Sequence, residues 1–116
     1  MKKAKPINKN QDFKRLYSKG RFSSSALLVT YVMKNRFKYT RVGFTASKKI
    51  GNAVQRNRAR RVLRASYSFL KNSVRMGTDI VFVARKSTYG AKTQEVLKDM
   101  TYQLKKLGVL EWKVLF

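Results

Sequence analysis

Residues 48–64, KKIGNAVQRNRARRVLR, combine dense positive charge with the absence of any acidic residue. Side chains four positions apart lie on one face of a helix, so Arg56, Arg60 and Arg64 would form a row. Like charges at this spacing repel each other by roughly 0.2–0.5 kcal/mol per pair, and a merely solvated face usually interleaves acids that offset this cost. The planar guanidinium binds phosphate through two parallel hydrogen bonds. The pattern therefore predicts a helix face that binds a polyanion.

Three further polar residues extend this face around the same helix. Asn57 and Arg61 continue round the polar side, and Arg58 lies furthest from the apolar side. The Asn57 amide both donates and accepts hydrogen bonds, so it could reach a base edge or a ribose 2′-hydroxyl. A helix can also enter the DNA major groove, but residues 42–52 indicate a strand and a loop rather than the first helix of a helix-turn-helix. Composition alone leaves DNA and RNA open.

The side chains that most often perform acid–base or metal chemistry are scarce in this chain. It has no histidine and no cysteine, which removes the commonest general base, thiolate metal sites and disulfides. Its five acids, Asp12, Asp79, Glu95, Asp99 and Glu111, show no local clustering, although a fold could bring some of them together. We therefore predict no catalytic residue and no metal ligand in this chain.

The composition as a whole indicates a small folded domain with an anionic partner. The 116 residues carry 28 Lys and Arg against five acids, a formal charge of +23, while 43% are apolar. Such a charge opposes compaction unless a polyanion neutralises it, so nucleic acid is the expected partner. No apolar run approaches the roughly 20 residues that span a bilayer, and the N-terminus lacks the apolar segment of a signal peptide. We expect a single domain over residues 1–116, no membrane partner and a cytoplasmic location.

Apolar periodicity predicts the helix that carries the basic residues. It is expected over residues 53–71, after a loop in which Gly51 permits unusual backbone angles and Asn52 caps the helix. Its core-facing stripe comprises Ala59, Val62, Leu63, Ser66, Tyr67 and Leu70.

Other segments predict the elements around this helix. Further helices are expected over 8–19, capped by Asn8 or Asn10, and over 93–107, capped by Thr93. Gly20 and Gly108 would end them. Strands are expected over 26–33, 41–47 and 79–85, while 109–116 form a final strand or an extended tail. The order predicts an α+β fold, a mixed α/β sandwich with a sheet of about four strands and three helices.

A group of aromatic residues offers a second possible site. Phe13 and Tyr17 lie one turn apart on the first helix, and Val29 and Tyr31 share one face of the first strand. Both faces of that strand are largely apolar, so either both are covered or one receives a ligand. Rings beside Lys and Arg suit the stacking of unpaired bases, at about 1–3 kcal/mol per base. Spacing alone does not separate this role from core filling.

Residues 41–64, RVGFTASKKIGNAVQRNRARRVLR, resemble the signature of the bacterial ribonuclease P protein subunit, with Arg56-Asn57-Arg58 at the family's RNR motif. NKNQDFKRLYSKG resembles the family's first helix with its two aromatics, and DIVFVARK resembles the strand after the basic helix. The similarity covers most of the chain and is weakest in GVLEWKVLF at the C-terminus. It implies a left-handed βαβ crossover, which periodicity would not predict because right-handed crossovers dominate.

The resemblance also implies a function. Ribonuclease P removes the 5′ leader of precursor tRNA; its catalyst is a large RNA with Mg²⁺, and its protein binds that RNA and the leader. Mg²⁺ would belong to the RNA active site, and no obligate protein partner is expected. By the same resemblance, the leader would contact Phe13, Tyr17, Val29 and Tyr31, although the family often has Phe at position 17. The residues expected to contact the catalytic RNA are Lys48, Lys49, Arg56, Asn57, Arg58, Arg60, Arg61 and Arg64.

Three other classes of function stay open on the residues alone. A structural RNA-binding protein, for example of the ribosome, would share the charge and the core but would need no leader cleft. A basic DNA-binding module would prefer duplex DNA over structured RNA. A protein-only nuclease would cleave RNA as the purified chain and would depend on its own carboxylates.

Overall fold

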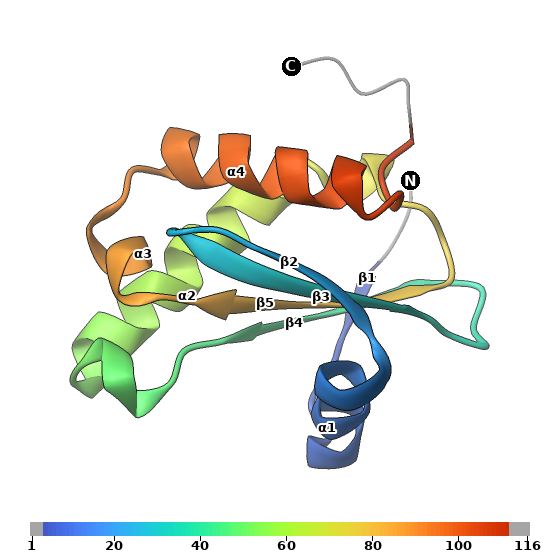
Figure 1. Cartoon of the computed structure of the whole chain (residues 1–116), viewed down its shortest axis with the longest axis horizontal. Helices are drawn as coiled ribbons and strands as arrows, with labels where there is room; N and C mark the ends of the chain where they lie inside the picture. Colours follow the sequence, from blue (N-terminus) through green and yellow to red (C-terminus); the bar gives the residue numbers. More distant parts are fainter. Residues whose placement is uncertain (1–3, 112–116) are drawn as a thin grey trace.

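Five strands form one mixed sheet in the computed structural model, which describes residues 4–111 (Figure 1). Their order across the sheet is β1-β4-β5-β3-β2. The strands are β1 (Ala4–Pro6), β2 (Arg21–Ser24), β3 (Leu28–Lys34), β4 (Thr40–Thr45) and β5 (Thr78–Ala84). The helices are α1 (Asn10–Lys19), α2 (Ala53–Ser68), α3 (Lys86–Gly90) and α4 (Thr93–Lys106), with short 3₁₀ helices η1 (Lys48–Ile50) and η2 (Lys71–Ser73).

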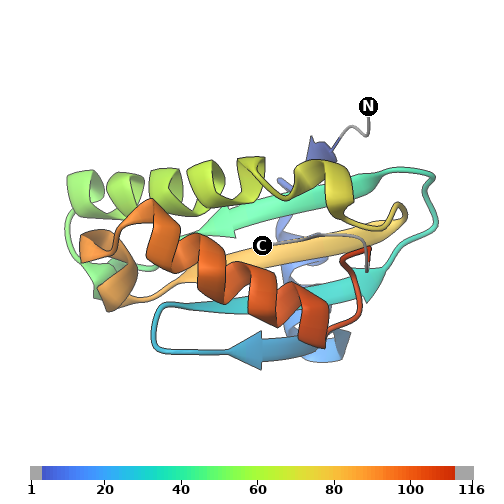
Figure 2. The ribbon, with the colours of Figure 1, turned by 90° about the horizontal axis from the view of Figure 1, so that it is seen from above.

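The helices cover the two faces of the sheet unequally. Helices α2 and α4 lie on one face, whereas α1 alone crosses the strands on the opposite face (Figures 1 and 2). Strands β1, β4 and β5 are mutually parallel, and β3 is antiparallel to both β5 and β2. Figure 2 views the sheet from the side that α2 covers; β4 points to the left, and the parallel β5 lies below it. When both strands are turned to point upward, β5 is therefore to the left of β4. The β4–α2–β5 crossover is therefore left-handed, which confirms the handedness implied by the resemblance.

Side-chain alternation in β3 separates two apolar clusters. Leu28 and Val32 are buried toward α2 and α4, while Val29 and Tyr31 face the other way and stay partly exposed. The larger cluster lies between the sheet and α2 and α4, and it includes the fully buried Phe82. The smaller cluster lies under α1 and has only three fully packed members, Ile7, Leu16 and Val81. The α1 face of the sheet is thus only partly covered.

Helix α2 confirms its predicted start and its buried stripe. Asn52 caps the helix, and all six residues of the predicted stripe are buried. The helix ends at Ser68 rather than at residue 71, because the Leu70 N–H bonds to the Tyr67 carbonyl in a tighter turn that leads into η2. No helix between residues 4 and 111 has the length and apolar character that a membrane crossing requires.

Three short elements, β1, β2 and α3, have no counterpart among the predicted elements, so the sheet has five strands rather than about four. Strand β2 has the mostly polar sequence RFSS, and α3 has five residues in a segment that reads as a loop. Strands β1 and β2 are held by pairing with β4 and β3, and α3 is held by hydrogen bonds from Ser87 and Thr88 to the carbonyls of Ala26 and Leu27. These contacts leave little local signal in the sequence. Of the predicted final strand, Leu110 forms an isolated bridge with Val74, and residues 112–116 lie outside the described part of the chain.

Two predicted helix caps are wrong. Helix α4 is capped at Lys92 rather than at Thr93, because the Glu95 side chain accepts a hydrogen bond from the Lys92 N–H at 3.2 Å. Helix α1 begins after Lys9, and neither Asn8 nor Asn10 is its N-cap. Gly20 and Gly108 end their helices as predicted: Gly108 adopts φ +75°, and a Cβ on Gly20 would lie 2.6 Å from the Leu16 carbonyl oxygen.

Candidate nucleic-acid interface

A capping box fixes the start of the basic helix. The Asn52 side chain accepts a hydrogen bond from the Gln55 N–H at 2.9 Å, and the Gln55 side chain accepts one from the Asn52 N–H at 2.9 Å. Gly51 has φ +145°, and a Cβ there would lie 1.9 Å from the Gln55 side-chain oxygen. The local sequence GNxxQ therefore sets the direction of α2. It also places the exposed Lys48 and Lys49 of η1 directly before the helix.

The structure brings all eight residues predicted to contact the catalytic RNA to this helix and to the turn before it. We call Lys48, Lys49, Arg56, Asn57, Arg58, Arg60, Arg61 and Arg64 the basic face. The Arg56 guanidinium donates to the Gly51 carbonyl at 2.7 Å, and Arg60 donates to the Asn57 side chain. These contacts orient the side chains without neutralising their charge.

Two arginines of the basic face also contact neighbouring elements. Arg58, placed by the helical pattern furthest from the core, donates to the Tyr89 carbonyl of α3 at 3.1 Å and lies 6.0 Å from the Tyr89 ring. The Arg64 guanidinium lies 5.3 Å above the ring of Phe44, which stacks on the buried Phe82. Arg64 therefore contributes to packing as well as to the positive surface.

No carboxylate within residues 4–111 pairs with the basic face. The four ion-pair contacts between described residues all join Arg15 or Arg41 to Asp12 or Asp79. The sequence has no acid between Asp12 and Asp79, so no basic residue of the helix or of the turn before it has an acidic neighbour along the chain. The basic face is therefore an uncompensated positive surface, which suits a polyanion.

Strand register arranges the α1 face of the sheet in rows of side chains. Thr45, Val83 and Val29 are cross-strand neighbours in one row, and Gly43, Val81 and Tyr31 are neighbours in the next. Phe13 of α1 lies over Gly43, where a Cβ would be 2.9 Å from the Phe13 ring. Helix α1 thus covers the second row, and the first row stays open beside it.

A series of aromatic rings borders that open row. The ring centroids of Phe13 and Tyr17 are 6.3 Å apart, and those of Tyr17 and Tyr31 are 5.0 Å apart in an edge-to-face pair. Phe22 of β2 extends the series, 5.7 Å from Tyr31. Tyr17 is 44% exposed and Phe22 is 62% exposed, so both rings present surface to a ligand. Phe22 was not a predicted site residue, because its strand has no clear pattern in the sequence.

Two adjoining pockets form a groove along the open row. One, of about 370 Å³, is lined by Tyr17, Tyr31 and Val83 among others, and the second, of about 710 Å³, is lined by Val29 and again by Val83. We call these two pockets together the aromatic groove. Three of the four residues predicted to contact the leader line it, while Phe13 packs behind them.

The aromatic groove has a basic end. Lys49 of the basic face lines the second pocket together with Arg85 and Lys86, which follow β5. Arg85 and Lys86 were not predicted site residues. The signal that could have found them is the position of two cations immediately after a buried strand, at the strand end where the groove opens. The groove and the basic face are therefore neighbours that share Lys49.

The acidic residues Asp12 and Asp79 meet in a compact network with two arginines. Arg41 donates to Asp79 at 2.9 and 2.6 Å and to Asp12 at 3.3 Å, and Arg15 donates to Asp12 at 3.1 Å. The hydrogen bond with Asp79 is the main cause that raises the pKa of Arg41 above its usual value. Within residues 4–111, no group of three or more acidic side chains gathers in the way a metal site requires.

The fold and the site define a class: a small, strongly basic α+β protein with an acid-free basic helix beside an aromatic groove, features that suit a nucleic-acid ligand. The sequence matches the family model for Ribonuclease P over residues 1–108. The ribonuclease P protein component of Alkaliphilus oremlandii is 37% identical over 110 residues, which cover 95% of this chain and 96% of the relative. That of Clostridioides difficile is 34% identical over 108 residues, which cover 92% of this chain and 95% of the relative. This chain belongs to the bacterial ribonuclease P protein family.

Solved structures agree with this assignment. The RNase P protein of Staphylococcus aureus superposes with a TM-score of 0.81 at 33% identity and covers 94% of this chain and 100% of its own. The RNase P protein of Thermotoga maritima has a TM-score of 0.77 at 24% identity over 88% of this chain and 96% of its own, which supports the fold. The protein is thus a component of ribonuclease P, the endoribonuclease complex that processes the 5′ end of tRNA, and ribonuclease P RNA is its partner.

Proposed function

We propose that the two surfaces divide the protein's work within the holoenzyme. The basic face binds the catalytic RNA, and the aromatic groove holds the single-stranded 5′ leader of precursor tRNA. The observation that carries the proposal is the adjacency of the two surfaces through Lys49, which belongs to the basic face and lines the groove. A leader in the groove would then leave the tRNA body next to the RNA bound by α2.

The groove suits a leader of any sequence. Its exposed rings offer stacking surfaces, and every base has a face that can stack. Its basic end, at Lys49, Arg85 and Lys86, offers charge to backbone phosphates. Mature tRNA has no leader, so contacts in the groove would favour the precursor over the product.

We further propose that the Mg²⁺ ions of the reaction are bound by the RNA subunit rather than by this chain. The carboxylates of this chain are a poor donor set, because Asp12 and Asp79 are both hydrogen-bonded to arginine. The bound metal would activate water and stabilise the leaving oxygen. The positive field of the basic face would lessen the repulsion between two RNAs at moderate salt. We also propose a cytoplasmic location, with no membrane and no obligate protein partner.

Cleavage of precursor tRNA at low Mg²⁺ tests the assignment of roles. We expect a bacterial ribonuclease P RNA to cut at the mature 5′ end when this protein is added, and to cut poorly without it. The protein alone should not cut; RNA cleavage by the purified chain that depends on its own carboxylates would instead favour a protein-only nuclease. A folded, RNA-binding protein that fails to stimulate the RNA would favour a structural RNA-binding role.

Replacement of the groove rings tests the leader site separately. In the holoenzyme, Tyr17→Ala and Tyr31→Leu should each weaken precursor binding by about 1–3 kcal/mol for each base that no longer stacks, with little effect on mature tRNA. Tyr102→Leu, at a 64% exposed ring on α4, is the matched control. Equal weakening for precursor and mature tRNA would contradict the proposed leader site and leave the assignment to the holoenzyme intact.

A further inference from the structure

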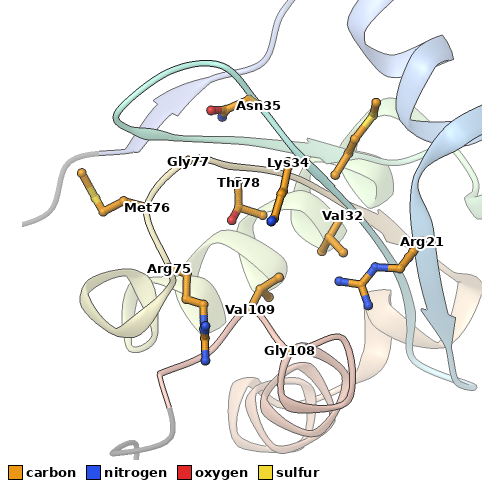
Figure 3. Close-up of a pocket in the computed structure, with 11 residues that line it drawn as sticks. Arg21, Val32, Lys34, Asn35, Arg75, Met76, Gly77, Thr78, Gly108 and Val109 are labelled. Carbon is orange, nitrogen blue, oxygen red and sulfur yellow. The ribbon is translucent and has the colours of Figure 1, made fainter.

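A pocket at the far end of the sheet belongs to neither proposed surface. It has a volume of about 660 Å³ and lies where β2 begins, β3 ends, β5 begins and α4 has just ended (Figure 3). We call it the sheet-end pocket. Its lining includes the cations Arg21, Lys34 and Arg75, which come from three different segments of the chain.

The strand register explains why charged side chains lie on this part of the sheet. Arg21 pairs with Val32, and Lys34 pairs with Thr78, so these side chains share the face that α2 and α4 cover. Helix α4 ends at Lys106, however, and the chain turns away at Gly108 with φ +75°. Helix α4 therefore does not cover this end of the face, and the largely buried Val32 and Thr78 line the pocket beside the exposed cations.

Hydrogen bonds with the surrounding chain fix the Arg21 side chain and the main chain of Arg75. The Arg21 guanidinium donates to the Leu107 carbonyl at 2.7 Å, which uses one of its five N–H groups and satisfies a carbonyl at the end of α4. The main chain of Arg75 is fixed on both sides: its N–H donates to the Val109 carbonyl at 2.8 Å, and its carbonyl accepts from the Thr40 hydroxyl at 3.0 Å. Figure 3 shows Lys34 and Arg21 extending over the pocket from the sheet, with Arg75 at the opposite rim.

Among residues 4–111, no carboxylate lines the sheet-end pocket. The nearest acid along the strands, Asp79, has its side chain on the α1 face, where Arg41 and Asn35 bind it. Three cations in one pocket repel each other, and an anion would remove that repulsion. Arginine binds phosphate through paired hydrogen bonds, lysine binds it as a point charge, and a hydroxyl group can donate a further hydrogen bond.

We propose that the sheet-end pocket binds a phosphate group. Two sources share this chemistry: the backbone of an RNA that extends past the basic face, and a free phosphate anion. The pocket lies at the opposite end of the sheet from the start of α2 (Figure 1). An RNA contact there would be additional to those of the basic face and the aromatic groove, whereas a free anion would act as a stabilising ligand of the fold.

The test compares two double variants of the full-length protein. Lys34→Gln with Arg75→Gln removes two pocket cations and spares Arg21, whose bond to Leu107 supports α4. Lys98→Gln with Lys105→Gln removes the same charge from a separate groove on the outer side of α4. Titration with inorganic phosphate is followed by NMR at the amides of Gly77, Thr78 and Gly108. Binding to ribonuclease P RNA is measured over a series of salt concentrations.

Saturable shifts of the pocket amides that are absent only from the pocket variant would support the proposal. If that variant also lowers the salt slope of RNA binding by about 0.7–0.9 log unit for each phosphate that it no longer binds, beyond the control, the phosphate belongs to RNA. If the shifts disappear but RNA binding matches the control, the ligand is a free anion. If the two double variants behave alike in both measurements, the pocket is not a phosphate site. Circular dichroism of each variant ensures that only folded proteins are compared.

Discussion

Two sets of arginines in this molecule have the same side chain and opposite surroundings. Arg15 and Arg41 contact Asp12 and Asp79, while the arginines of α2 have no carboxylate partner within residues 4–111. The first set joins α1 to strands β4 and β5 and leaves little charge for a ligand. The second set keeps its charge available. Whether an arginine stabilises the fold or is available to bind a ligand therefore depends on whether it has a carboxylate partner, not on its residue type.

Burial makes the pair of Arg41 and Asp79 the structural part of the first set. The side chain of Arg41 is 14% exposed and that of Asp79 only 2% exposed. Asp79 accepts hydrogen bonds from Arg41 and also from the Asn35 side chain at 2.8 Å. A buried charge without its partner carries an uncompensated desolvation cost, which exceeds anything expected of a surface ion pair.

The largest expected effect is therefore that of neutralising the buried carboxylate. Asp79→Asn should lower the free energy of unfolding by about 3 kcal/mol, because Arg41 stays partly buried with its main partner removed. Urea denaturation measures the change. Glu95→Gln removes the same charge at an exposed position and keeps a side-chain acceptor for the α4 cap, so it should cost far less. Equal destabilisation of the two variants would show that the network adds no more than a surface charge.

The same comparison explains which features the sequence could predict. Helix α2 follows from local signals: Gly51 and Asn52 at its start, a stripe with a 3.6-residue period, and an arginine row without acids. Each signal lies within a few residues of the feature that it predicts. The positions of Asn57 and the arginines on α2 were therefore predicted from local signals, whereas Lys48 and Lys49 were added through the resemblance.

The network and the groove depend on contacts between distant segments, which leave no such signal. Asp12 and Asp79 meet only because α1 crosses the sheet over β4 and β5. Phe22 extends the series of rings beside the groove only because β2 pairs with β3 in a register that places it opposite Tyr31. The alternation of β3 showed two apolar faces, but it left open whether both would be covered and could not show which elements would border an open one. The left-handed crossover came from the resemblance alone.

A smaller effect is expected when two arginines of α2, which have no carboxylate partner within residues 4–111, are replaced. Arg60→Gln with Arg61→Gln should weaken binding to ribonuclease P RNA and lower the salt slope by about 0.7–0.9 log unit for each phosphate that the variant no longer binds. The free energy of unfolding should stay the same or rise slightly, because repulsion along the helix is reduced. Binding titrations at several salt concentrations measure the slope, with Lys98→Gln/Lys105→Gln as the charge-matched control. An unchanged slope would remove Arg60 and Arg61 from the RNA-binding surface.

The smallest expected effect comes from a substitution that gives the arginines of α2 an acidic partner. Val54 is 72% exposed in the first turn of α2, four residues before Arg58. A glutamate there would lie at the positive end of the helix dipole and at the favourable i, i+4 spacing from an arginine. Val54→Glu should therefore raise the free energy of unfolding by about 0.5 kcal/mol. Val54→Gln, which is similar in shape and uncharged, is its control.

The RNA affinity of Val54→Glu should change in the opposite direction to its stability. The added carboxylate would compete with phosphate for Arg58 and repel the backbone of the RNA, so binding should be weaker than for Val54→Gln. High salt should reduce the difference between the two variants, because exposed charges are screened. If Val54→Glu became more stable and bound RNA as tightly as Val54→Gln, the absence of acids from this helix would have no role in binding. Weaker binding together with higher stability would show that the protein gives up some stability to keep its basic face unpaired.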